Sequence, residues 1–414
     1  MRRKFTRAIA LTILALIIAS CASHYRPPHF EPESAVFSGL LNAGAPPADD
    51  VRVLWVHGMC HHSTDWVLQR VADLEKLGGV AATLEGAIDV PARPGQAGPL
   101  ARVYRYALRG GAMRHEFHFV VWSDLTREAK RSLCYDSSRR DDVAEVCDGA
   151  SDYPSARARG TLNDRLKSMI MNTCVSDALL YAGATGPAMR DRVAIAVCAA
   201  LSGLPPQPAR GGNPLPPAAC YDGDPSDWVP RAGPIAFVTE SLGSKILFDA
   251  LTASARPGAG RSPAAARAAL ERALYPTRQM FLLANQIPLL DLADRDVLAG
   301  GRDPGAPSPG GLGGALELMR PPVSREVAPA DRAPAPKLAP LEIVAFTDPN
   351  DLLSWRLLPG PLQRRGGGVT KVVNVLVSNE PTYLGLVERP DSAHLGYRSN
   401  ADVLILLMRG RAAR

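Results

Sequence analysis

The sequence predicts an α/β protein with a mostly parallel central sheet and helices on both faces. Short apolar runs of strand length recur along the chain, and helical patterns lie between them. Strands that alternate with helices are typical of a parallel sheet, because the crossover helices cover its two faces. At 414 residues, of which 46% are hydrophobic, the chain is also long enough to bury a large core.

The first twenty residues have the character of a signal peptide. A basic head precedes an apolar run at residues 8–19 that only Thr12 interrupts, too short a run to span a bilayer comfortably. The run ends in Ile18-Ala19-Ser20-Cys21, which resembles a bacterial lipobox with Cys21 as the lipid-attachment residue. Because Ala22 rather than Asp follows, the resemblance implies anchoring to the outer membrane, facing the periplasm. The alternative is a plain secretory signal with an incidental cysteine.

Processing at this point would remove most of the positive charge. The signal holds four of the 47 Lys and Arg residues and no acids, which leaves 43 basic against 41 acidic residues. The mature chain is therefore almost neutral, and its composition gives no reason to expect a nucleic-acid partner.

Six cysteines remain after Cys21, and five of them lie between residues 134 and 220. An even number in an oxidising compartment permits three disulfides, although 15 pairings are open. We expect most of the five to be bonded and to staple that region. Cys60-His61-His62 makes a poor zinc site, because neighbouring residues at a strand end point to opposite sides. We expect neither a metal nor a cofactor.

The first half of the chain divides into a tether, a strand–loop–helix unit and an insertion. Residues 21–50 are rich in proline and small residues and are predicted to tether the folded body to the lipid. A strand at 51–56 follows and ends in His57-Gly58-Met59, with a helix expected at 64–77 and a further strand at 117–122. Residues 126–230 form a connection too long for one crossover and carry most of the cysteines, so we predict a helical insertion there.

A serine lies at the junction of the next strand and helix. The apolar run at 234–240 stops at Ser241, and a helical pattern begins at once. A serine on such a strained turn needs small residues two positions before and after it. Gly243 meets this requirement, whereas Thr239 is larger. A strand followed by Ser-x-Gly also occurs at ordinary strand-to-helix junctions. Residues elsewhere in the chain must therefore decide whether Ser241 is catalytic.

The second half of the chain continues the alternation. Strands are predicted at 280–285, 341–347 and 371–378, and a last helix at 400–409. Residues 300–340 are crowded with Pro, Gly and Ala, which predicts a long surface loop or a disordered segment. The domain as a whole is expected to span 51–414.

Four local motifs resemble those of the α/β-hydrolase family: V-H-G-M at 56–59, T-E-S-L-G at 239–243, D-P-N-D-L-L-S-W at 348–355 and A-H-L-G-Y at 393–397. Their order along the chain, Ser, then Asp, then His, is the order that this family uses. The resemblance covers most of residues 51–410 apart from the insertion and the low-complexity stretch. It implies an α/β-hydrolase fold, with Thr239 as a departure from G-x-S-x-G.

The resemblance also implies a role for each residue. Ser241 is the expected nucleophile and His394 its base. Asp351 is the expected acid, although Asp348 at the same strand end is an alternative. The backbone N–H groups of Met59 and Leu242 are the expected oxyanion hole.

These roles predict a serine hydrolase of ester or thioester bonds, of esterase or lipase type, that forms an acyl-enzyme. Its substrate would be a small-molecule or lipid ester. Two alternatives stay open at this point. One is a binding or scaffold lipoprotein that keeps the fold without the chemistry, which Thr239 favours. The other is an acyltransferase that uses the same three residues.

Overall fold

The computed structural model describes residues 22–42, 51–91, 100–110, 113–137, 146–147, 159–209, 212–221, 233–255, 263–294, 311–320, 340–365 and 370–412. The predicted signal peptide and Cys21 therefore lie outside the described residues, and so do parts of the predicted insertion and of the low-complexity stretch.

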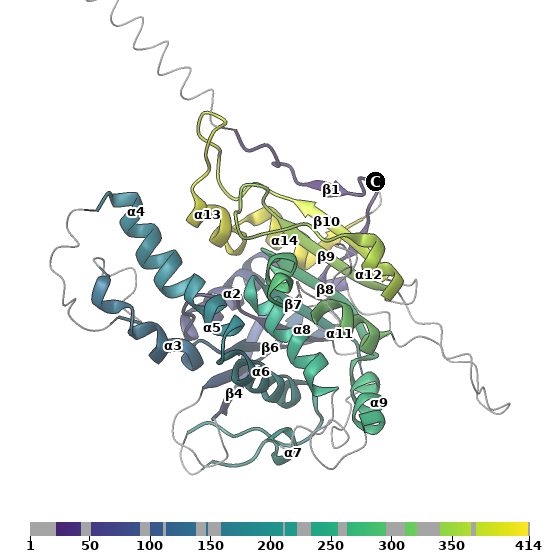
Figure 1. Cartoon of the computed structure of the whole chain (residues 1–414). Helices are drawn as coiled ribbons and strands as arrows, with labels where there is room; N and C mark the ends of the chain where they lie inside the picture. The colour runs from purple at the N-terminus through teal and green to yellow at the C-terminus, as the bar shows by residue number, and fades with distance from the viewer. Residues whose placement is uncertain are drawn as a thin grey trace, which may run out of the picture.

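Within the described residues, the core is a nine-stranded, mostly parallel sheet, as the sequence predicts (Figure 1). Six central strands are parallel, β4 and β5 continue the sheet antiparallel at one edge, and β1 pairs antiparallel with β10 at the other. The strands follow each other across the sheet in the order β1 (His29–Glu31), β10 (Thr370–Leu376), β9 (Leu341–Thr347), β8 (Thr277–Leu283), β7 (Ile235–Glu240), β3 (Val51–Val56), β6 (Met113–Val121), β5 (Ala101–Gly110) and β4 (Ala81–Val90).

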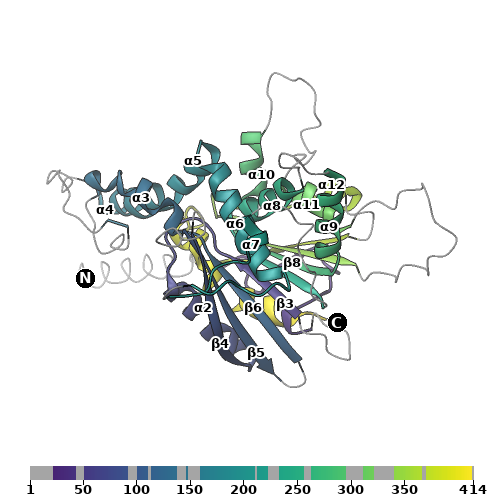
Figure 2. The ribbon, with the colours of Figure 1, turned by 90° about the horizontal axis from the view of Figure 1, so that it is seen from below.

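Helices cover both faces of this sheet, as Figure 2 shows. Along β7, Ile235 and Phe237 join the core on one face, whereas Ala236 and Val238 join the core on the other. This alternation buries the central strands on both sides, which explains their almost unbroken apolar sequences. The first face carries α6 (Gly186–Leu201), α8 (Leu242–Ser254), α9 (Pro263–Leu274), α11 (Gly311–Met319) and α12 (Pro359–Arg365), and the second carries α2 (Thr64–Gly78) and α14 (Ala401–Arg409).

The helices on the second face begin and end where their sequences provide caps. Ser63 precedes α2 and accepts a hydrogen bond from the Asp65 N–H through its side chain (3.3 Å), and the helix ends at Gly79 with φ 64°. Asn400 caps α14 in the same way, accepting from the Asp402 N–H (3.1 Å). Side-chain oxygens at these positions satisfy backbone donors that have no partner inside the helix.

A helical arm projects from the body between β6 and α6 (Figure 1). It consists of α3 (Asp124–Arg131), then a continuous helical run through α4 (Thr161–Arg165), a π-helical segment (Leu166–Val175) and α5 (Ser176–Ala182). The predicted insertion thus contains helices, but α6 does not belong to the projecting part. Val193, Ala196 and Val197 of α6 are buried in the core of the first face.

The structure differs from the sequence-based prediction in three places. The low-complexity stretch contains α11, in which every residue except Glu317 is buried, because Leu312, Leu316 and Met319 supply enough apolar surface to pack beside α8. Within the predicted tether, β1 pairs with β10, and β2 (Phe37–Ser38) pairs with β11 (Gly410–Arg411). Strands β4 and β5 were not predicted; β4 mixes exposed and half-buried residues and buries only Ile88 and Val90.

All six cysteines of the folded part lie in pairs at disulfide distance. Cys134 pairs with Cys147 and Cys198 with Cys220, which confirms that most cysteines between 134 and 220 are bonded. Cys60 pairs with Cys174 and so joins the loop after β3 to the helical arm.

Candidate active site

Ser241 occupies a strained turn between β7 and α8. Its backbone has φ 52° and ψ −126°, in the region that L-residues rarely adopt, and its N–H donates to the Leu283 carbonyl (2.8 Å). Gly243 is required two positions later, because a Cβ there would lie 2.3 Å from the His57 carbonyl oxygen. The strand–turn–helix geometry therefore holds the serine at the carboxyl end of the sheet.

Thr239 fits this turn through a hydrogen bond. Its side chain is fully buried, and its Oγ1 lies 2.7 Å from the Ser244 Oγ in the first turn of α8. The hydroxyl that makes threonine larger than glycine is thus satisfied inside the elbow. The departure from the G-x-S-x-G pattern is accommodated locally.

The structure brings together the three residues that the sequence selects. Ser241 Oγ lies 3.1 Å from His394 Nε2, and His394 Nδ1 lies 2.9 Å from Asp351 Oδ1 and 3.0 Å from Oδ2. His394 belongs to α13 (Pro390–Leu395), and Asp351 follows β9. All three residues are buried, with exposed fractions of 4–6%. Of the two candidate acids, Asp351 is the one that contacts the His394 imidazole.

Asp348 supports the turn that carries Asp351. Its two carboxylate oxygens accept hydrogen bonds from the backbone N–H of Asn350 (3.0 Å) and of Asn379 (2.6 Å). Burial raises the pKa of Asp348, and burial together with the Asp348 charge raises the pKa of Glu388 to about 7. Glu388 in turn accepts a hydrogen bond from the Asn350 side chain (2.8 Å). These contacts tie the turn after β9 to the loop after β10.

Tyr397 provides a second contact to Asp351 that the sequence does not assign. Its hydroxyl donates to Asp351 Oδ2 (3.1 Å) and accepts from the Asp348 N–H (2.6 Å). Burial raises the pKa of Tyr397 well above its ordinary value, and the negative charge of Asp351 acts in the same direction. The phenol therefore stays protonated and keeps the carboxylate in place. Its position three residues after His394 is the signal that could have indicated this role.

The loop after β3 lies directly against Ser241. A Cβ on Gly58 would lie 2.8 Å from both the Ser241 Cβ and the Glu240 carbonyl oxygen, so only glycine allows this approach. Met59 follows and is buried. Leu242 is the first residue of α8, where backbone N–H groups have no partner within the helix. The two predicted oxyanion donors thus lie on the two segments that meet at the serine.

His57 shapes this loop. Its Nδ1–H donates to the Gly58 carbonyl (2.6 Å), and its Nε2 accepts from the backbone N–H of Trp122 (2.9 Å). Its ring stacks on the Trp122 indole. Burial lowers the pKa of His57 well below its ordinary value, so the ring is neutral. This agrees with a structural role for the residue.

An ion pair between the buried Glu240 and the half-buried Arg398 joins the serine turn to the histidine segment. Glu240 is only 3% exposed, although the residue beside a nucleophile is usually expected at the surface. It accepts from the Trp55 indole N–H (3.0 Å) and from Arg398 Nε (2.9 Å). Because Arg398 lies four residues after His394, this pair helps to fix the distance between Ser241 and the imidazole.

A second anchor holds the loop after β3 to the helical arm. Cys60 has φ 81°, and its N–H donates to Asp177 Oδ2 (2.9 Å) in addition to the disulfide with Cys174. Asp177 forms an ion pair with Lys130 (3.0 Å), and both side chains are fully buried. Met59 is thereby fixed from the arm side as well as from the sheet. Sequence spacing could not have indicated the two contacts of Cys60, which join residues more than a hundred positions apart.

No protein-family model matches the chain, and neither a curated protein nor a solved structure matches it. The assignment of a function therefore depends on the geometry of the site itself.

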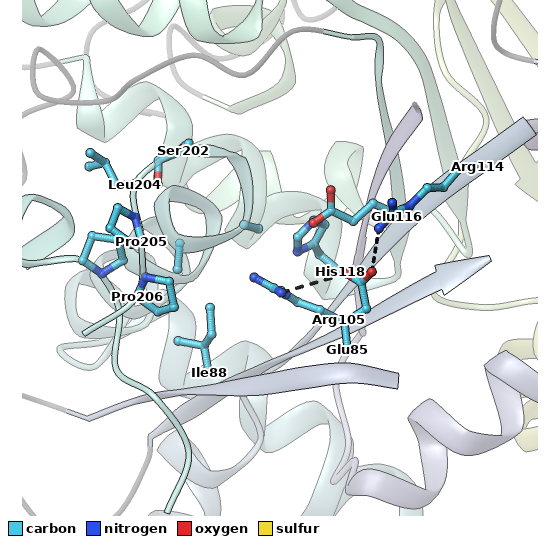
Figure 3. A pocket seen from close by; sticks show the side chains of 14 residues that line it. Glu85, Ile88, Arg105, Arg114, Glu116, His118, Ser202, Leu204, Pro205 and Pro206 are labelled. Atoms are coloured by element: carbon cyan, nitrogen blue, oxygen red, sulfur yellow. Dashed lines mark hydrogen bonds and ion pairs between the residues drawn. The ribbon is translucent and has the colours of Figure 1, made fainter. Parts of the chain in front are cut away.

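A cavity of about 740 Å³ lies away from Ser241, between the antiparallel edge strands and the end of α6 (Figure 3). Its charged wall consists of Glu85, Arg105, Arg114, Glu116 and His118. Glu85 pairs with Arg114 (2.7 Å) and lies 3.9 Å from Arg105. In the register of the parallel strands, Leu54 of β3 pairs with both His118 of β6 and Phe237 of β7. His118 therefore lies at the height of a residue four positions before Ser241, and this cavity does not open beside the serine. Among the described residues, no cluster of three or more His, Cys, Asp and Glu side chains could hold a metal ion.

Proposed function

We propose that this protein is a serine hydrolase of ester or thioester bonds with an α/β-hydrolase fold. The observation that carries the proposal is the continuous contact from Ser241 through His394 to Asp351, built on a serine whose φ is 52° at a strand-to-helix turn. The fold assignment is supported by the parallel order of the central strands and by the chain order Ser, Asp, His.

In this proposal each group has a role that its contacts support. His394 Nε2 accepts the Ser241 proton while Oγ attacks the ester carbonyl, and the resulting imidazolium then protonates the leaving alcohol. Water attacks the acyl-enzyme by the reverse sequence, which releases the acid and restores Ser241. Asp351 accepts the Nδ1–H and so keeps the imidazole in the tautomer whose Nε2 is free to accept.

We assign stabilisation of the oxyanion in the tetrahedral intermediate to the backbone N–H groups of Met59 and Leu242. Support comes from the contact of Gly58 with Ser241 and from the position of Leu242 at the N-terminus of α8, where the helix dipole favours negative charge. One such donor is typically worth about 2.7–4 kcal/mol of transition-state stabilisation.

The alternative of a silent scaffold loses its main argument, because Thr239 is accommodated by Ser244. A buried carboxylate, imidazole and serine hydroxyl in contact are also costly to maintain unless they have a use. No contact among the described residues favours an acyl acceptor other than water, so we propose hydrolysis.

A fluorophosphonate probe tests the proposal directly. Purified protein should be labelled covalently, and Ser241→Ala should abolish labelling because the attacking oxygen is absent. Ser254→Ala is the matched control, since Ser254 lies on the same helix and its hydroxyl donates to the Ala250 carbonyl one turn earlier (2.9 Å). Equal labelling of wild type and Ser241→Ala would assign the reaction to another residue.

We also propose that Cys21 carries a lipid that anchors the enzyme to a bacterial envelope membrane. The described residues contain no helix that is long and apolar enough to cross a membrane. Cys21→Ser should leave the membrane fraction or remain unprocessed in cell fractionation. A variant that is processed and sediments like wild type would contradict this anchor.

A further inference from the structure

Ala22 lies at the same end of the sheet as the serine site, beyond the carboxyl ends of the parallel strands. Because β1 runs antiparallel to β10, the residues before His29 extend past the carboxyl ends of the parallel strands. Ala22 pairs there with Thr382 through two backbone hydrogen bonds (3.1 and 2.8 Å), and the Thr382 hydroxyl also donates to the Ala22 carbonyl (2.8 Å). Ser241, Asp351 and the segment that carries His394 follow carboxyl ends of the same sheet.

Next to this contact, residues 383–387 form a small hairpin, which we call the apolar hairpin. Tyr383 and Val387 are paired, and Leu386 at its tip is 84% exposed. Leu384 adopts φ 54°, an unusual conformation for a leucine, which turns the chain tightly beside Gly385. Four of the five residues are thus large apolar side chains in contact with solvent: Tyr383, Leu384, Leu386 and Val387.

The apolar hairpin is held close to the serine site. At its base, Glu388 accepts a hydrogen bond from Asn350 (2.8 Å), the residue before Asp351. Leu352, directly after Asp351, is also apolar and 71% exposed. In Figure 1 the purple segment before β1 reaches the same corner as the loop between β10 and α13. A cluster of exposed apolar side chains of this kind marks an interaction site.

The place of the proposed lipid anchor indicates the occupant. Cys21 is joined to Ala22, so a lipid on Cys21 starts one residue, about 4 Å, from the contact with Thr382. We infer that the apolar hairpin inserts into the surface of the bilayer that holds this lipid. The serine site then faces that membrane and takes its ester substrate from it. This inference rests on the proposed hydrolase and anchor, and it deepens them by naming a membrane lipid ester as the substrate class.

Insertion can be measured without turnover. Full-length lipidated protein carrying Leu386→Trp is reconstituted into vesicles of phosphatidylcholine brominated on its acyl chains, and the fluorescence of wild type is subtracted. We expect strong quenching of the introduced tryptophan. The control is Leu84→Trp, since Leu84 is 55% exposed on β4 at the opposite edge of the sheet and should not be quenched.

Equal quenching at both positions, or none at position 386, would overturn the inference, and so would failure of the wild type to float with the vesicles. A second copy of the chain seated on the apolar hairpin would give dimers in detergent without quenching, which also overturns it. Because no catalysis is involved, these results are independent of whether the protein is a hydrolase.

Substrate access is the second measurement. Leu384→Ser/Leu386→Ser should lower hydrolysis of diacylglycerol embedded in phosphatidylcholine vesicles by about tenfold, because apolar contacts that hold the site at the bilayer are lost. The rate on soluble p-nitrophenyl acetate, which needs no bilayer, serves as the reference. An equal fall on both substrates would contradict membrane docking, whereas a wild type inactive on both would refute the proposed hydrolase and leave the quenching result to decide on insertion.

Discussion

Replacing Asp351 with asparagine is expected to lower the turnover of an ester substrate by about 10⁴-fold, because an amide favours the wrong imidazole tautomer. In the native site, His394 Nδ1 lies within 3.0 Å of both Asp351 oxygens and donates its proton to the carboxylate. An asparagine that presents its N–H₂ group would instead favour a proton on Nε2, which could then no longer accept from Ser241. The KM should change little, since Asp351 does not contact Ser241.

The matched control is Asp348→Asn. It changes the same atom type three residues away, in a carboxylate that accepts from the N–H groups of Asn350 and Asn379. One lost acceptor should cost about 1–3 kcal/mol of stability, with turnover within a few-fold of wild type. Steady-state kinetics and melting temperatures of both variants decide between the acids. If Asp348→Asn loses turnover while Asp351→Asn keeps it, Asp348 is the acid that orients His394.

The parts of the site that sequence could predict are those fixed by strand ends. Ser241, Asp351 and His394 each follow the carboxyl end of a predicted strand, and parallel strands bring such ends to one edge. The preference for Asp351 over Asp348 came from the resemblance to the α/β-hydrolase family, in which the acid lies a few residues beyond the strand. The sheet itself was predictable because its central strands are buried on both faces and therefore continuously apolar.

What sequence could not predict are contacts between distant segments. The ion pair of Glu240 with Arg398 and the bond of Tyr397 to Asp351 depend on how loops from different strands meet. The helix α11 was obscured by its flanking Pro- and Gly-rich residues, which dominate the local composition. Cys60 was separated from the other cysteines, so nothing in its spacing indicated Cys174 among 15 pairings.

That disulfide leads to the second large effect. The Cys60–Cys174 bond closes a loop of 114 residues, so Cys60→Ser/Cys174→Ser should lower the free energy of unfolding by about 4–5 kcal/mol in the chain-entropy model. The same change should lower kcat. Cys60 has φ 81° and adjoins Met59. Without the disulfide, the loop would be held to the arm at Cys60 by the hydrogen bond from its N–H to Asp177.

Loss of an oxyanion donor typically costs 10²- to 10³-fold in kcat. In this variant the Met59 N–H is still present but less firmly held, so kcat should fall less, by about tenfold. KM should be nearly unchanged because the donor acts in the transition state. Cys134→Ser/Cys147→Ser is the control, since it removes a disulfide from the same arm that spans only 13 residues. It should cost about 3 kcal/mol of stability and leave kcat intact. Urea unfolding and ester kinetics on both variants separate the effects: if kcat falls equally in the two, the Cys60–Cys174 bond stabilises the arm without positioning the oxyanion loop.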